Sequence, residues 1–170
     1  MGDSGKGTAT VNISGDPHLT LGGVEGVSDG TTVINITDNA KVDINGEVQL
    51  VSDVNATLLM NISGNANITS SGKWQLADNG KAIVNISGNP NIVIYEQWRN
   101  GDDEAGYVEI HMSGGSLYTD RYLCIYDDGS AMFDFSGGTV VVTGLSFSGR
   151  NCESTAEINV SGTADITTYD

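Results

Sequence analysis

A five-residue pattern of apolar and polar positions recurs seven times along the chain. It consists of an apolar residue, a polar residue, a second apolar residue, Ser or Thr, and then Gly in six of the seven copies. Such alternation with a period of two is typical of a β-strand with one buried face. The central polar position recurs at steps of 23 to 26 residues, with a mean of about 24.5. Its members are Asn12, Asn35, Asn61, Asn85, His111, Asp134 and Asn159.

Two further apolar positions follow each motif at nearly the same step. The members of the second column are Leu19, Val42, Ile68, Ile92, Leu117, Val140 and Ile166. A weaker third column precedes an acidic turn, and its members are Val27, Val51, Leu76, Ile125 and Phe147. The member of this column in the fifth repeat is not evident. Three short strands in a constant repeat predict a coil of a parallel β-solenoid. We therefore expect an all-β, single-stranded parallel β-helix of about seven coils, each of about 24.5 residues with three strands.

The pleat of a strand assigns each position of the motif to the inside or the outside. Side chains alternate between the two faces, so the second apolar residue points inward and the Asn column points outward. The inward column comprises Ile13, Ile36, Ile62, Ile86, Met112, Phe135 and Val160. The Gly after each Ser is expected to turn the corner because Gly adopts positive φ without penalty. Asp38 replaces this Gly in the second coil, and Asp tolerates that conformation better than most residues.

In this architecture the sequence resembles the right-handed parallel β-helix proteins, which include adhesin and autotransporter passenger domains and pectate-lyase-like polysaccharide enzymes. The resemblance rests on the repeated motif, covers roughly residues 8–170 and includes no catalytic motif of those enzymes. It implies a right-handed coil and a location outside the cell or on its surface. We expect residues 1–7 to be a linker and residues 8–170 to form a single solenoid domain, a fragment of a longer protein.

Charge removes several classes of partner. Seven basic residues against 22 acidic ones leave a formal net charge of −15 and a pI of about 4.1. Nucleic-acid binding requires clustered Lys and Arg, and an anionic membrane surface would repel this chain. No apolar run approaches the roughly 20 residues of a transmembrane helix, so no membrane insertion is expected.

Aspartates recur at the coil step in the third corner of five successive repeats. Neighbouring carboxylates about one strand spacing apart repel one another, and a hard cation with oxygen ligands would relieve this. The predicted ligands of a calcium ion are Asp78, Asp102, Asp103, Asp127 and Asp128. The alternative is that Asp-Gly and Asn-Gly are good turn formers whose solvated carboxylates splay apart.

Large side chains gather in coils four to six. Exposed aromatic rings beside carboxylates suit a sugar, because the ring stacks on the pyranose and the acids accept bonds from its hydroxyls. The predicted carbohydrate-binding residues are Tyr95, Trp98, Tyr107, Tyr118, Tyr122, Asp103 and Glu104. The alternative is that these rings only cover an irregular coil.

The remaining reactive side chains are few. His18 and His111 lie four coils apart, which argues against a shared metal or a catalytic pair. Cys124 and Cys152 occupy neighbouring coils, and a disulfide between them is one possibility in an exported protein.

Three functions remain open. The leading hypothesis is a non-catalytic, exported module of an adhesin or extracellular scaffold with weak carbohydrate binding on coils four to six. Uncapped coil ends would also favour end-to-end self-association. The first alternative is a pectate-lyase-like, calcium-dependent enzyme in which Arg99, Arg121 or Arg150 acts as the base. The second is ice binding by the regular Asn-x-Ser columns, although efficient ice faces favour threonine.

Overall fold

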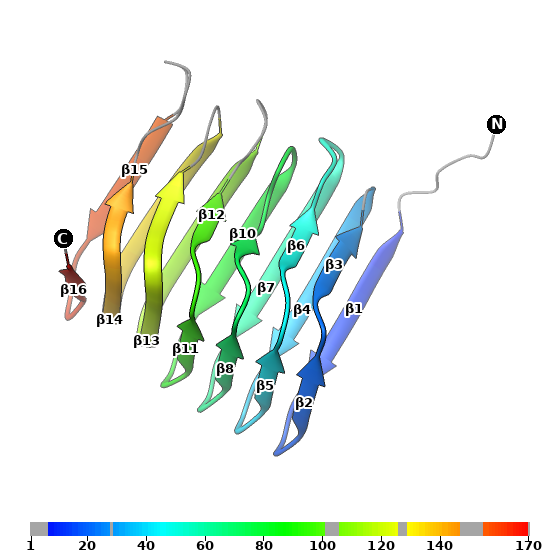
Figure 1. Ribbon diagram of the computed structural model, residues 1–170, viewed down its shortest axis with the longest axis horizontal. Coiled ribbons are helices and arrows are strands. Elements are labelled where there is room, and N and C mark those ends of the chain that lie inside the picture. Colours follow the sequence, from blue (N-terminus) through cyan, green and yellow to red (C-terminus); the bar gives the residue numbers. More distant parts are fainter. Residues whose placement is uncertain (1–6, 28, 101–105, 126–128, 147–154, 170) are drawn as a thin grey trace.

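A computed structural model describes residues 7–27, 29–100, 106–125, 129–146 and 155–169. All regular elements in these ranges are strands, and all the strand pairs are parallel. Successive repeats lie side by side in one stack, with the first and last strands of the chain at opposite ends of it (Figure 1). The predicted all-β parallel solenoid is therefore confirmed. The described residues contain no helix with the length and apolar character that crossing a bilayer would require.

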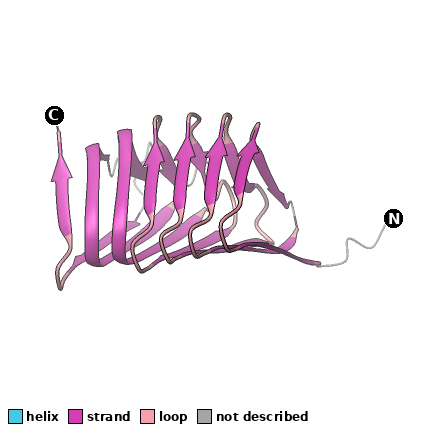
Figure 2. Ribbon diagram, turned by 90° about the horizontal axis from the view of Figure 1, so that it is seen from below, coloured by secondary structure: helices cyan, strands magenta, loops and turns pink. Residues whose placement is uncertain are grey.

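Strands with equivalent places in successive repeats form three faces, and strands and loops alone build the stack in the described residues (Figure 2). Face one comprises β1 (Thr8–Ile13), β4 (Gly30–Ile36), β7 (Ala56–Ile62), β10 (Lys81–Ile86), the first parts of β13 (Tyr107–Ile125) and β14 (Ser130–Ser146), and β15 (Thr155–Val160). Face two comprises β2 (His18–Leu21), β5 (Lys41–Ile44), β8 (Asn67–Ser70), β11 (Asn91–Ile94), the middle of β13 and β14, and β16 (Asp165–Thr168). Face three comprises β3 (Val24–Val27), β6 (Val48–Val51), β9 (Trp74–Gln75), β12 (Trp98–Asn100) and the last parts of β13 and β14.

The hydrophobic core runs along the inside of the stack and follows the predicted alternation. In β4, Ile34 and Ile36 are buried, whereas Val33 and Asn35 between them lie on the outer surface. The inward column of the motif is buried in every repeat except the last described one. There Val160 is 54% exposed, because among the described strands β15 pairs with β14 alone.

Positive φ angles mark the corner after face one. Asp38 has a φ of 62°, and Gly64 in the equivalent place of the next coil has a φ of 70°, as the sequence predicts. In the coils formed by β13 and β14 the corner is instead at Gly115 and Gly138, with φ angles of 83° and 88°. The prediction that Gly114 and Gly137 turn these corners is therefore wrong. The corner of the β13 coil is one residue shorter than that of the preceding coil: four residues separate Ile86 from Asn91, and three separate their register partners Met112 and Ser116.

β12 contributes a buried aromatic residue to face three in the fourth coil. Trp98 is fully buried, and its indole lies 5.1 Å from that of Trp74 at an interplanar angle of 49°. The backbone register pairs Trp98 with Trp74 on one side and with Leu123 on the other. The position in register with Ile125 of the predicted third column is Asn100, so the two tryptophans form a separate inward column that the apolar pattern did not reveal.

Candidate functional site

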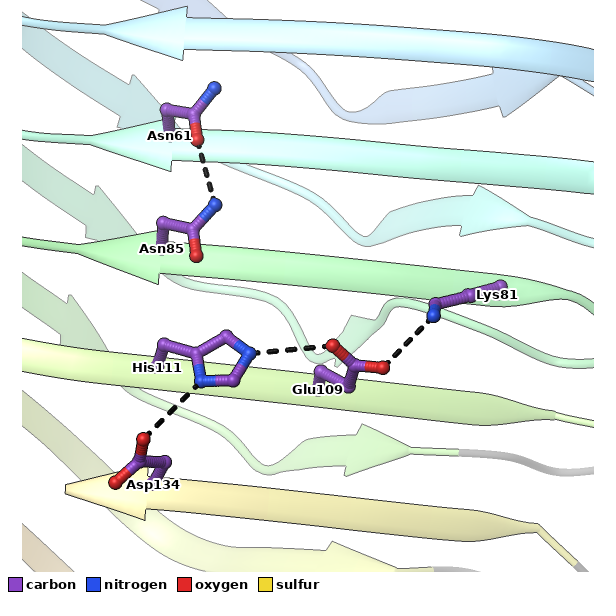
Figure 3. Close-up of polar contacts among 6 residues, drawn as sticks. All are labelled: Asn61, Lys81, Asn85, Glu109, His111 and Asp134. Carbon is purple, nitrogen blue, oxygen red and sulfur yellow. Dashed lines mark hydrogen bonds and ion pairs between the residues drawn. The ribbon is translucent and has the colours of Figure 1, made fainter.

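The outer surface of face one carries a row of hydrogen-bonded amides, the Asn ladder, formed by Asn12, Asn35, Asn61 and Asn85. Each Nδ2 donates to the Oδ1 of the preceding coil, at 2.7 Å from Asn35 to Asn12 and 2.8 Å from Asn61 to Asn35. The bond from Asn85 to Asn61 measures 2.9 Å (Figure 3). Successive hydrogen bonds in such a row polarise and strengthen one another. The amides therefore link the coils together, which reduces the hydrogen-bonding capacity they offer to an external lattice such as ice.

A charged network continues face one beyond the ladder, and it comprises Lys81, Glu109, His111 and Asp134 (Figure 3). Glu109 is its centre: Lys81 Nζ lies 2.9 Å from Glu109 Oε1, and His111 Nε2 lies 3.3 Å from Glu109 Oε2. His111 Nδ1 lies 3.6 Å from Asp134 Oδ2 in the next coil. The hydrogen bond from Lys81, followed by that from His111, lowers the pKa of Glu109. An ionised, well-partnered carboxylate is a poor proton donor, so this network has the character of a cross-link between coils.

Four tyrosines lie at the corner between face two and face three, and we name this group the tyrosine corner: Tyr95, Tyr118, Tyr122 and Tyr169. Tyr95 directly follows β11, Tyr118 and Tyr122 belong to β13, and Tyr169 directly follows β16. Three of them are exposed by 50 to 59%, whereas Tyr118 is half-buried. These exposed rings come from three different coils and lie on one side of the stack.

A groove of about 440 Å³ separates two of these rings. It is lined by Tyr122, Tyr169 and the residues between them, which are Thr143, Gly144, Leu145 and Thr168. A Cβ atom at Gly144 would lie only 2.9 Å from two ring carbons of Tyr122. The absence of a side chain at Gly144 thus allows the Tyr122 ring to lie against the backbone of the next coil.

Polar groups surround the rings of the tyrosine corner. The Tyr118 hydroxyl donates to Asp120 Oδ1 at 2.7 Å, and this bond raises the pKa of Tyr118. Arg121 Nε lies 3.3 Å from Glu96 Oε2, and Thr143 Oγ1 donates to the backbone oxygen of Asp120 at 2.7 Å. The corner therefore combines apolar ring faces with both donors and acceptors, a combination that fits a hydroxyl-rich ligand.

The structure separates the predicted carbohydrate-binding residues into several groups. Tyr95, Tyr118 and Tyr122 lie together at the tyrosine corner. Tyr107 lies on face one, where Lys81 Nζ is 5.1 Å from the centre of its ring and burial raises its pKa. Trp98 is in the core, so its predicted place on a ligand-binding surface is wrong. Asp103 and Glu104 lie outside the described residues.

Of the predicted calcium ligands, only Asp78 lies within the described residues; Asp102, Asp103, Asp127 and Asp128 lie outside them. The Gln49 amide donates to Asp78 Oδ2 at 2.6 Å, and the Gln75 amide donates to Asp78 Oδ1. In the described part of the chain, no three His, Cys, Asp or Glu side chains are arranged to hold a metal ion. Calcium binding stays a prediction. Its test is a comparison of the melting temperature in EDTA with that in millimolar calcium, because a ligand that binds the folded state raises the melting temperature.

The other candidate residues lie in separate places. His18 is on face two, 2.7 Å from Asp43 Oδ2, whereas His111 is on face one. Hydrogen bonds from His18 and then Lys41 lower the pKa of Asp43. Cys124 is buried on β13, and the predicted partner Cys152 lies outside the described residues.

Sequence reasoning missed two features that the coil step itself could have indicated. Tyr169 follows Thr143 by 26 residues and Asp120 by 49 residues, so it shares their corner. Lys81 pairs in register with Tyr107, which places it beside Glu109 across neighbouring coils. Both features become visible only when the outward positions are aligned as carefully as the inward ones.

Comparisons with protein-family models, with curated proteins and with solved structures found no match for this chain.

Proposed function

We propose that this chain is a non-catalytic, exported binding module, part of an adhesin or extracellular scaffold, that holds carbohydrate at the tyrosine corner. The observation that carries the proposal is the group of exposed rings of Tyr95, Tyr122 and Tyr169 beside hydrogen-bonding side chains. Exposed rings of this size are costly to leave in water, and large exposed apolar surfaces commonly mark binding sites. The tyrosine ring offers an apolar face to the C–H face of a sugar, while its hydroxyl remains hydrated.

The chemistry of the polar groups favours binding over catalysis. Glu96 is paired with Arg121, and Asp120 accepts from Tyr118, so these acids already have partners. A glycosidase needs two carboxylic groups with separated pKa values on either side of the scissile bond. The tyrosine corner offers an ion pair and a hydrogen-bonded carboxylate, which suit the recognition of hydroxyl groups.

The test is a glycan array followed by calorimetry on the full chain. Tyr122→Ala and Tyr169→Ala each remove one side of the groove, and Tyr107→Ala is the matched control because its ring lies on face one. We expect the first two variants to lose binding to the glycans that the native chain captures, and the control to retain it. Equal binding by all three variants would refute the tyrosine corner as the site.

A second assay separates binding from cleavage. The native chain is incubated with polygalacturonate and calcium, and the unsaturated products of an eliminative reaction are followed by ultraviolet absorbance. The proposal predicts no such products. Their appearance, and their loss in Arg121→Ala, would favour the lyase alternative instead.

A further inference from the structure

We infer, resting on the proposed function, that the ligand of the tyrosine corner is an uncharged polysaccharide chain that runs parallel to the solenoid axis across four coils. The inference concerns the direction, the length and the charge of the ligand. It follows from the register of the strands that carry the tyrosines and from the charged groups beside them.

The backbone register places two exposed tyrosines in one row along the stack. Ile94 pairs with Thr119, which pairs with Val142, which pairs with Thr168. The residues that directly follow these four are Tyr95, Asp120, Thr143 and Tyr169, and we call them the row; the register of β13 and β14 shifts between Thr119 and Tyr122. Figure 1 shows β11, β13, β14 and β16 in this order along the stack. Three strand spacings of about 4.8 Å place the ends of the row about 14 Å apart.

The space between the two ends of the row is suited to a continuous chain. Tyr118 and Tyr122 project from the coil between them, and the groove beside Tyr122 opens towards Tyr169. Asp120 and Thr143 occupy the middle of the row and are joined by the bond from Thr143 Oγ1 to the backbone of Asp120. A single sugar ring would contact only one end, whereas an extended chain contacts an aromatic ring at both ends and polar groups between them.

The charges at the corner exclude an anionic polymer. Beside the row, Glu96 and Arg121 neutralise each other's charge. Within the row, Asp120 is the one charged residue, and its negative charge has no cationic partner among the described residues. The whole chain has a net charge of −15, so a uronate or sulfated polymer approaches against a repulsive field. The largest exposed surfaces at the site are uncharged rings, and their natural complement is the uncharged C–H face of a pyranose.

The experiment is a length series measured by calorimetry. Neutral β-linked oligosaccharides of glucose, mannose, xylose and N-acetylglucosamine, from disaccharide to hexasaccharide, are titrated into the native chain and into Tyr95→Ala and Tyr169→Ala. We expect affinity to rise with length. Tyr95→Ala should weaken hexasaccharide binding by about three- to tenfold, the effect of one aromatic contact, and leave disaccharide binding in the groove unchanged. Tyr169→Ala should weaken both.

Different failures have different meanings. Binding that does not depend on length or on Tyr95, with Tyr169 still required, would overturn the axial chain while leaving the proposed function in place. Capture of only cationic amino-sugar polymers, abolished by raised salt, would overturn the neutral ligand. If no carbohydrate bound at all, the proposed function would fail, and this inference with it.

Discussion

The corner glycines allow the stacking of the coils to be tested by adding one carbon atom. Gly15 and Gly64 have equivalent places after face one, with φ angles of 83° and 70°. Alanine in this left-handed region costs about 1–2 kcal/mol at either position. A Cβ atom at Gly15 would have no neighbour within 4 Å, whereas one at Gly64 would lie 2.7 Å from the Asp38 nitrogen and 2.8 Å from its carbonyl oxygen. These are backbone atoms, so relief requires the movement of a whole coil.

We therefore expect Gly15→Ala to lower the free energy of unfolding by about 1–2 kcal/mol. Gly64→Ala should cost about 1–3 kcal/mol more, the usual penalty of overpacking. Urea denaturation followed by circular dichroism measures both, and with a slope of about 2 kcal/mol per molar urea the midpoints should differ by about 0.5–1.5 M. Asp38→Gly is the control: it should not rescue Gly64→Ala, because the close contact is with the backbone. Equal destabilisation at the two glycines would refute the close stacking of the coils.

Three further predictions concern single side chains. Trp98→Ala should cost about 3–5 kcal/mol in urea denaturation, because the indole is fully buried, and a native-like midpoint would contradict its place in the core. Asn61→Ala removes two ladder bonds and should cost more than Asn12→Ala, which removes one, with each bond worth about 1 kcal/mol; the reverse order would argue against the ladder. Glu109→Gln should lower stability at neutral pH and flatten its acid dependence. The folded-state pKa of Glu109 lies below its ordinary value of 4.5. The stability that the ionised Glu109 contributes is therefore fully present above pH 4.5 and is lost as the pH falls through the folded-state pKa. An unchanged pH profile of melting temperature would contradict that role.

The solenoid was predictable because each coil repeats the same alternation. An inward aliphatic residue beside an outward Asn, as at Ile62 and Asn61, allows one strand register and one buried face. The corner in the coils of β13 and β14 was not predictable, since Gly114 and Gly115 both tolerate positive φ. The two glycines differ in their place within a corner that is one residue shorter than that of the preceding coil, and only the strand register reveals this shortening.

The candidate site was predictable only in part, because aromatic residues suit both the core and the surface. Trp98 and Tyr95 are three residues apart, yet one is buried and the other is 53% exposed. Composition does not distinguish them, whereas alignment with the coil step does: Trp74 precedes Trp98 by 24 residues, which marks an inward column. The charged network around Glu109 required knowledge of neighbours across coils, which outward positions in a single repeat do not reveal.

The most direct test of the proposed site follows the tyrosine rings themselves. The chain has six tyrosines, so nuclear magnetic resonance of ring-labelled protein yields a simple spectrum that Tyr→Phe variants assign. A neutral oligosaccharide that the glycan array identifies is then titrated in. The account predicts shifts at Tyr95, Tyr118, Tyr122 and Tyr169, with Tyr107 on face one unmoved. Shifts at Tyr107 alone, with the tyrosine corner unmoved, would contradict it.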